Sequence, residues 1–225
     1  MDDVVETTTM EHRKETAPFD EADAATKPTI NRALSERLQA MAARDHETRD
    51  RLLAEGALYG TYAIAMQRVH RENAEALAEL IEAHGWPSMA LVGREGCRAA
   101  WLVAQHAIAT PALQRRFLAC LRQAAEAGDV PRRQWAMLED RVRFNEGRPQ
   151  RFGTVLDWND DGELDCELED PAVVDSWRRE VDLPPFAESL ASHRAEVAAE
   201  GGHAPADLED YRRRAAAWAK ETGWR

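Results

Sequence analysis

The chain has 225 residues, and its 41 acidic residues outnumber its 29 lysines and arginines, which gives a formal net charge of −12 at pH 7. Such a negative field repels phosphate backbones and anionic lipid surfaces, so neither nucleic acid nor a membrane is expected as a partner. No apolar run approaches the roughly 20 residues that cross a bilayer, and the acidic first residues do not resemble a signal peptide. These features together predict a cytoplasmic protein.

The first part of the chain is predicted to be a tail followed by one domain. Residues 1–28 are rich in acidic residues and threonine and lack apolar periodicity, which predicts a disordered acidic tail. A single α-rich domain is expected over 29–200, and a C-terminal helix over 201–225 is expected to pack on its surface. The three cysteines are widely separated and form no C-x-x-C pair, so we expect packed, reduced thiols.

The first two helices differ in how clearly the sequence marks them. Leu34, Leu38 and Met41 recur at helical spacing after Ile30, and Thr29 or Asn31 can cap the start of that helix. The segment 55–70 is ambiguous because its glycines interrupt the helical pattern. A second helix is predicted over 72–84, where an apolar stripe ends at a Gly-Trp-Pro stop signal.

Three further helices are predicted over 95–108, from Thr110 and from Pro131, with short loops that favour antiparallel packing. The pattern then changes to two strands within 149–168, joined by a turn at Asn-Asp-Asp-Gly. Helices over 171–181, 186–199 and 207–220 complete the chain. The sequence therefore predicts a mainly α fold: a helical bundle-like domain with one β-hairpin and additional C-terminal helices.

The turn of the predicted hairpin resembles the beginning of a calcium loop. Asp157, Asn159, Asp161 and Gly162 stand at the spacing of the first ligands and the glycine of such a loop. The twelfth position is Leu168, where a calcium loop needs a bidentate Glu. Asn, Asp and Gly also favour tight turns for conformational reasons, so we interpret the segment as a structural turn.

A polar cluster is the main functional prediction. Gln105 and His106 interrupt an apolar helix, and Asp140 and Arg141 interrupt the apolar pattern of a later one. An imidazole in a partly desolvated pocket can be tuned by a carboxylate to work near neutral pH. We therefore expect His106 as the catalytic acid or base and Asp140 as the group that orients it. The predicted contacts to a small-molecule substrate are Gln105, Arg141, Gln150, Thr154 and Arg179.

Other kinds of site find less support. No metal-ligand spacing such as H-x-x-x-H surrounds His106, so no metal and no cofactor are predicted. The chain also lacks a G-x-S-x-G nucleophile motif and a phosphate-binding loop. The alternative to an enzyme is a non-catalytic ligand-binding or protein-interaction module, in which the buried polar residues only fix the helix register. The sequence does not specify an oligomeric state.

Several short motifs occur in an order that resembles a bacterial protein family of unknown function. They are Gly85-Trp86-Pro87, Val92-Gly93, Gln105-His106-Ala107, Asp140-Arg141-Val142 and Gln150-x-Phe152-Gly153-Thr154. The resemblance covers roughly residues 34–190 and implies a shared fold, without an activity, substrate or cofactor. Phe152 stands where that family has tyrosine, and Val155 stands where it tends to have glutamine. No role that needs a phenol or an amide at those positions is therefore carried over.

Overall fold

The computed structural model describes residues 30–57 and 62–225, and these ranges form eight α-helices, one short 3-10 helix and a two-stranded hairpin. The predicted mainly α class with one hairpin is confirmed. The predicted tail, 1–28, lies outside the described residues. Five helices build the bundle: α1 (Arg32–Ala54), α2 (Ile64–His84), α3 (Met89–His106), α4 (Pro111–Glu126) and α5 (Arg132–Asn145).

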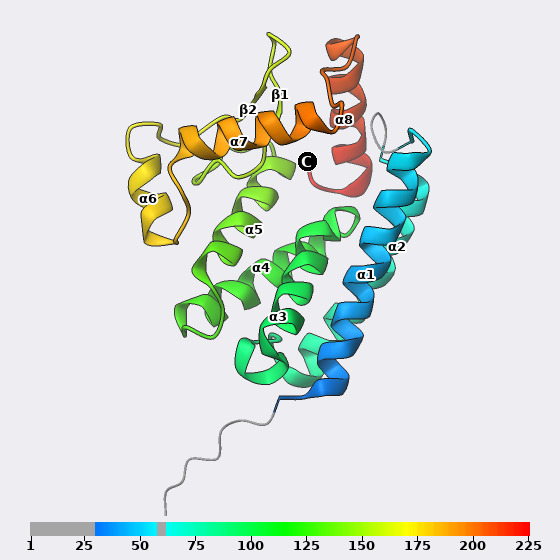
Figure 1. Ribbon diagram of the computed structural model, residues 1–225, viewed down its shortest axis with the longest axis vertical. Coiled ribbons are helices and arrows are strands. Elements are labelled where there is room, and N and C mark those ends of the chain that lie inside the picture. The colour runs from blue at the N-terminus through cyan, green and yellow to red at the C-terminus, as the bar shows by residue number, and fades with distance from the viewer. Residues whose placement is uncertain (1–29, 58–61) are drawn as a thin grey trace, which may run out of the picture.

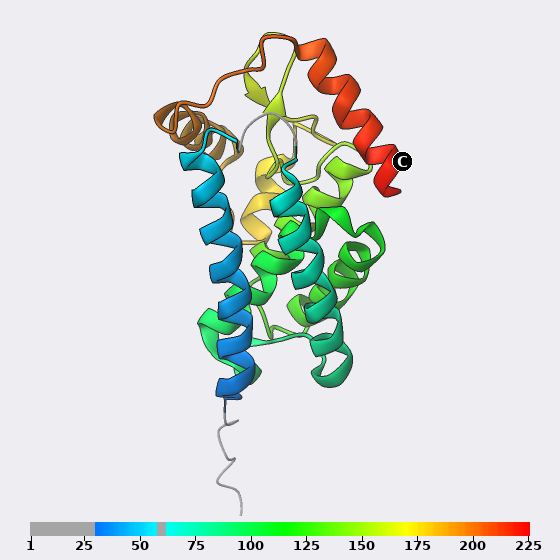
Figure 2. The same cartoon turned by 90° about the vertical axis from the view of Figure 1, so that its right-hand side faces the viewer.

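The core of the bundle comes from the apolar stripes of these helices. In α1 the side chain of Asn31 accepts a hydrogen bond from the Leu34 amide at 3.0 Å, so the predicted cap is present. Leu38 is completely buried together with Leu77 of α2 and Phe117 of α4. Figure 2 shows α1 and α2 running antiparallel beside one another, and α3 packs against both. None of the helices in the described ranges is long and apolar enough to cross a membrane.

Two helices begin earlier than the sequence predicts. Helix α2 starts at Ile64 rather than at residue 72, because Met66 and Val69 continue its buried stripe toward the N-terminus. The rest of the ambiguous segment includes 58–61, which lie outside the described residues. Helix α3 starts at Met89 rather than at residue 95 and is interrupted at Gly93, whose φ of 73° is not helical. It ends at His106, where the 3-10 turn η1 (Ala107–Ala109) follows.

The hairpin is shorter than expected. Strands β1 (Asp157–Trp158) and β2 (Leu164–Asp165) pair antiparallel, with Asp157 opposite Asp165. The preceding segment 150–156 was predicted to extend the first strand, but it forms a loop against α5. Gln150 makes a single bridge to Leu168, and the amides of Arg151, Phe152 and Thr154 bond to a buried side chain of α5, as described below, so they are not available for a strand ladder.

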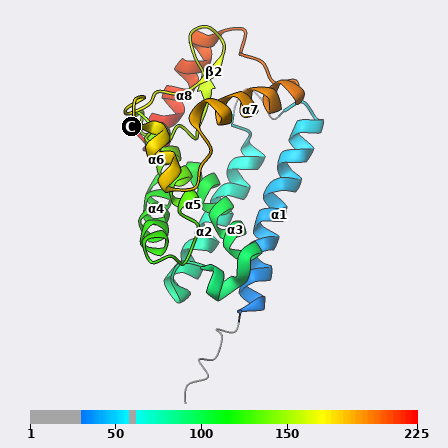
Figure 3. The same cartoon turned by 60° about the vertical axis from the view of Figure 1, so that its left-hand side comes forward.

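The last three helices are α6 (Val174–Glu180), α7 (Phe186–Ala199) and α8 (Leu208–Thr222). Figures 1 and 3 show α7 lying across one end of the bundle, next to β2. After α8 the chain turns back onto the bundle. Trp224 is only 4% exposed, and its indole nitrogen donates to the Ile108 carbonyl at 2.8 Å. This bond fixes the C-terminal segment to η1, directly after α3.

Candidate functional site

Three polar side chains from three different helices meet at the end of the bundle that α7 and α8 cover. They are Asp45 of α1, His70 of α2 and His106, the last residue of α3. Asp45 Oδ2 lies 2.8 Å from His106 Nδ1 and 3.0 Å from His70 Nε2. We call these three residues the Asp45 cluster. A carboxylate between two imidazoles is an arrangement suited either to proton transfer or to metal binding.

Asp45 is the buried centre of this cluster, with 2% of its side chain exposed. Burial by itself raises the pKa of a carboxyl group, but the hydrogen bonds and the charges of His106 and His70 lower the pKa of Asp45 well below its ordinary value. Asp45 is therefore an ionised carboxylate at neutral pH and can only accept hydrogen bonds. The Nδ1 atom of His106 must then carry the proton of the bond that joins them.

His106 is the exposed member of the cluster, with 32% of its side chain accessible. Burial lowers the pKa of His106, as does the charge of Arg141, whereas Asp45 opposes this change. The imidazole is consequently neutral at pH 7. Since Nδ1 carries the proton, Nε2 carries a free lone pair. That nitrogen has no hydrogen-bond partner among the described residues, so it is available to a ligand.

His70 connects the cluster to a tyrosine. Its Nδ1 atom lies 2.5 Å from the hydroxyl of Tyr62, and burial raises the pKa of Tyr62, which keeps the phenol protonated. The protonated hydroxyl can donate to Nδ1, while Nε2 on the other side of the ring faces Asp45. Tyr62 also packs edge-to-face on Trp218 of α8, with ring centroids 5.8 Å apart. Tyr62 thus links α2, α8 and the Asp45 cluster.

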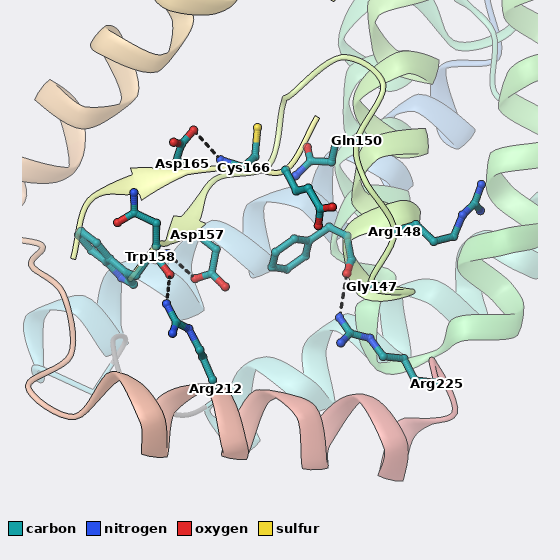
Figure 4. Close-up of a pocket in the computed structure, with 12 residues that line it drawn as sticks. Gly147, Arg148, Gln150, Asp157, Trp158, Asp165, Cys166, Arg212 and Arg225 are labelled. Atoms are coloured by element: carbon teal, nitrogen blue, oxygen red, sulfur yellow. Dashed lines mark hydrogen bonds between the residues drawn. The ribbon is translucent and has the colours of Figure 1, made fainter. Parts of the chain in front are cut away.

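Tyr62 also lines a cavity of about 550 Å³ between the bundle end, the hairpin and α8. Its walls are mainly apolar and aromatic, with Trp158, Tyr211 and Trp218 among them. This volume suits a small molecule. A second cavity of about 600 Å³ lies between the hairpin and the C-terminal segment, where Gln150, Arg212 and Arg225 contribute to the lining (Figure 4).

Unpartnered polar atoms are concentrated around the cluster. Seven buried side-chain nitrogen or oxygen atoms in the described part of the chain lack a hydrogen-bond partner, and four belong to this region: Asp45 Oδ1, His70 Nε2, Gln105 Oε1 and Arg141 Nε. His70 Nε2 is included because its bond toward Asp45 is poorly directed, although the two atoms are close. Buried polar atoms are normally satisfied by protein, water or a ligand, so these four atoms can bond to a water molecule or to a bound ligand.

The Asp45 cluster has a donor set that could hold a metal ion. One ligand atom from each of the three residues lies within 4.8 Å of the others. Neighbouring ligands at right angles around an ion, each at about 2.05 Å, would be about 2.9 Å apart, close to the 2.8 and 3.0 Å measured from Asp45 Oδ2. Two imidazoles and one carboxylate are also a common ligand set for first-row transition metals.

The expected bond between His106 and Asp140 is not formed, because each residue has a different partner. Asp140 is completely buried in α5 and accepts hydrogen bonds from the amides of Arg151, Phe152 and Thr154, and from the Thr154 hydroxyl, at 2.9 to 3.2 Å. Burial raises the pKa of Asp140, while these bonds oppose the change. Asp140 anchors the 150–155 loop, and Asp45 takes the place predicted for it beside His106.

Three of the predicted substrate contacts have structural partners instead. Gln150 Oε1 accepts from the amides of Thr154 and Val155, and Gln150 Nε2 donates to the Val155 carbonyl at 2.6 Å. Gln150 and Thr154 therefore shape the same loop as Asp140. Gln105 is 6% exposed and donates to the Met137 carbonyl at 3.3 Å. Only its Oε1 atom is left free for another group.

Of the two arginines of α6, the sequence singled out Arg179 as a substrate contact, but Arg178 is the one that the fold buries. Arg179 is exposed, whereas Arg178 is 2% exposed and donates to the carbonyls of Phe152 and Gly153, among other groups. Arg178 is therefore the buried member of the pair and binds the carbonyls of the 150–155 loop, whereas Asp140 binds its amides. Arg141 remains near the cluster and is considered further below.

Sequence reasoning missed Asp45, His70 and Tyr62. A signal for Asp45 was present, because the buried positions of α1 follow one stripe: Leu38, Met41, Asp45, Thr48 and Leu52. An aspartate in such a stripe requires a partner, just as His106 does. His70 likewise lies on the buried side of α2, next to Val69. Its helical setting was hidden because it is the last residue of the ambiguous segment 55–70.

The comparisons with known proteins give a family without a function. No match to the chain was found among curated proteins or among solved structures. A model of a family of unknown function matches residues 32–196, which includes all five helices of the bundle and the three residues of the Asp45 cluster. The chain therefore belongs to this family of unknown function, DUF6624.

Proposed function

We propose that the protein is a small-molecule enzyme in which His106 acts as a general base and then as a general acid. The observation that carries this proposal is the 2.8 Å bond between His106 Nδ1 and the buried carboxylate of Asp45, together with the unpartnered Nε2 on the exposed side of the ring. This is the relation between an imidazole and its orienting carboxylate in known acid–base dyads.

The mechanism follows from the protonation states. His106 Nε2 takes a proton from a bound substrate or from a water molecule, and the ring becomes an imidazolium. Asp45 stabilises that charge through Nδ1–H and holds the ring orientation. His70, which contacts the Tyr62 hydroxyl, lies against the same oxygen of Asp45, Oδ2, and helps to hold it in place. The proton then returns from Nε2 to the product. Asp45, His70 and Tyr62 are positioning residues in this scheme.

A second candidate is a metal-dependent reaction at the same cluster. It is favoured by Asp45 Oδ1, a buried oxygen that the acid–base scheme leaves without a partner, and by His70 Nε2, whose contact with Asp45 does not have hydrogen-bond geometry. Both atoms are suitable ligands. The two schemes exclude one another at any moment. A metal on His106 Nδ1 would replace the proton that bonds to Asp45, and a metal-bound water would then take over the role of the base.

The test combines turnover with the protonation state of His106. The metal-free protein is incubated with a defined pool of small carboxylates and phosphate esters, and substrate loss is followed by mass spectrometry. His106→Asn should abolish turnover, and Asp45→Asn should reduce it strongly. His46→Asn is the matched control, since His46 is exposed and adjacent to Asp45 in sequence. Nitrogen-15 NMR should show a neutral His106 protonated at Nδ1 near pH 7.

The outcomes separate the candidate functions. A His106 protonated at Nε2 in the metal-free protein would contradict the acid–base scheme even if no substrate were found. Turnover that appears only after addition of Zn²⁺, Mn²⁺ or Fe²⁺, and disappears with chelator, would support the metal-dependent reaction instead. Equal turnover by the wild type and His106→Asn would remove His106 from catalysis. An unfolding midpoint lowered by His106→Asn, with no binding or turnover in the wild type, would favour the non-catalytic module.

A further inference from the structure

Arg141 lies in α5 where that helix faces the end of α3. Met137 is one turn earlier in the helix, and its carbonyl accepts the hydrogen bond from Gln105, the neighbour of His106. Residues four positions apart in an α-helix lie on the same face, so Arg141 and Met137 share the side directed at Gln105 and His106. The charge of Arg141 is also close enough to His106 to contribute to its electrostatics.

The guanidinium of Arg141 has no carboxylate partner among residues 30–57 and 62–225. Its Nε atom is buried without a hydrogen-bond partner, and Arg141 forms no ion pair with any described residue. Burial lowers the pKa of Arg141, which reflects the cost of keeping this charge away from water. The next arginine of the helix, Arg143, behaves differently, because it bonds to both Glu139 and Glu169. In a protein with a net charge of −12, carboxylates are plentiful, so a half-buried arginine without a carboxylate partner is unexpected.

We propose that Arg141 binds the oxyanion group of the substrate, a carboxylate or a phosphate, beside His106. This inference rests on the proposed function and deepens it, because it names the chemical class of the ligand. A guanidinium presents several N–H donors in a plane that match two oxygens of such a group. The unpartnered Gln105 Oε1 can accept a hydrogen bond from a hydroxyl or an amide of the same ligand. An anion held there would place its neighbouring atoms next to His106 Nε2.

The test measures binding of the anion itself and does not depend on turnover. Inorganic phosphate and acetate are titrated separately into the full-length protein at constant ionic strength, using calorimetry and the unfolding midpoint. The wild type should be stabilised saturably by at least one of them, and the tighter ligand identifies the oxyanion class. Arg141→Gln should weaken this binding by at least tenfold. Arg179→Gln is the matched control, because that arginine is exposed and has no partner in the described structure.

Two additional variants make the result unambiguous. His106→Asn should lose turnover but retain anion binding, so that failure of the acid–base proposal and failure of this inference can be told apart. Without added anion, Arg141→Gln should melt at the wild-type temperature or above it, because the substitution removes an uncompensated charge. Arg178→Gln, which removes a fully bonded buried arginine, should melt lower. Absence of saturable binding in the wild type, or equal binding by Arg141→Gln, would overturn the inference.

Discussion

Replacing Asp140 by asparagine should destabilise the fold rather than act on catalysis, because the carboxylate of Asp140 organises the 150–155 loop. In the wild type, Oδ1 accepts from the Arg151 amide, Oδ2 accepts from the Thr154 amide and hydroxyl, and both oxygens share the Phe152 amide. An asparagine has only one accepting oxygen, and its NH₂ group must face backbone N–H donors on the other side.

The expected loss of unfolding free energy in Asp140→Asn is set by the less costly of the two orientations of the asparagine amide. With the NH₂ group at the Oδ1 position, the Arg151 amide loses its acceptor, while Phe152 and Thr154 keep theirs. One unsatisfied buried donor costs about 1–3 kcal/mol. Asp140→Ala would leave both the Arg151 and the Phe152 amides without an acceptor, for a cost of about 2–6 kcal/mol, whereas the Thr154 amide would still bond to Gln150 at 3.1 Å.

Urea denaturation of Asp140→Asn, Asp140→Ala and the wild type measures these differences in the free energy of unfolding. For a chain of this size, 1 kcal/mol corresponds to about 2–4 °C in the melting temperature. Asp161→Asn is a suitable control, since Asp161 is exposed and should change stability by less than about 0.5 kcal/mol. If Asp140→Asn were as stable as this control and instead lost turnover, the anchoring role of Asp140 would be wrong and the original catalytic prediction would be restored.

Three other predictions concern pH, the C-terminus and calcium. Because the pKa of Asp45 is lowered on folding, the stabilisation that its carboxylate provides is complete above the ordinary value of 3.8 and is lost as pH falls toward the folded-state value. The difference in unfolding free energy between the wild type and Asp45→Asn should therefore shrink below pH 4. A difference that stays constant would contradict this prediction. Trp224→Ala should cost about 3–5 kcal/mol by urea denaturation, because the indole is buried and bonded to Ile108; a loss under 1 kcal/mol would show that the C-terminal segment is not firmly docked. Millimolar calcium should not raise the melting temperature more than magnesium does, because Asn159 Oδ1 already accepts from the amides of Asp161 and Glu163; saturable, chelator-reversible stabilisation would mean that the turn is a calcium site.

Helical periodicity predicted most of the bundle because it reflects burial along a single element, and the stripe of Leu34, Leu38 and Met41 is buried as expected. The helix over 186–199 was also predicted at its observed bounds, although it carries no fully buried residue. The strands were predicted too long because the amides of Arg151, Phe152 and Thr154 are satisfied by a side chain 11 to 14 residues earlier. Alternation of residue types in a sequence does not reveal such a competitor.

The candidate site was predicted only in part for a related reason. His106 was found because it interrupts an apolar run in its own helix, and Asp140 because it lies in another apolar helix. Which carboxylate meets which imidazole depends on how the helices cross, and Asp45 is 61 residues away from His106. The sequence of a single helix is enough to predict that a polar group in it is buried. Which buried groups pair with one another depends on how the helices pack in the bundle.

The two buried ionic residues around the 150–155 loop have a consequence for how the molecule opens. Asp140 binds the amides of this loop, and Arg178 binds the carbonyls of Phe152 and Gly153 and the hydroxyl of Ser189 in α7. Releasing the loop therefore breaks contacts to α5, α6 and α7 together. Although residues 151–154 belong to no helix or strand, the amides of Arg151, Phe152 and Thr154 should exchange with solvent deuterium as slowly as those of the neighbouring helices, in one cooperative opening event.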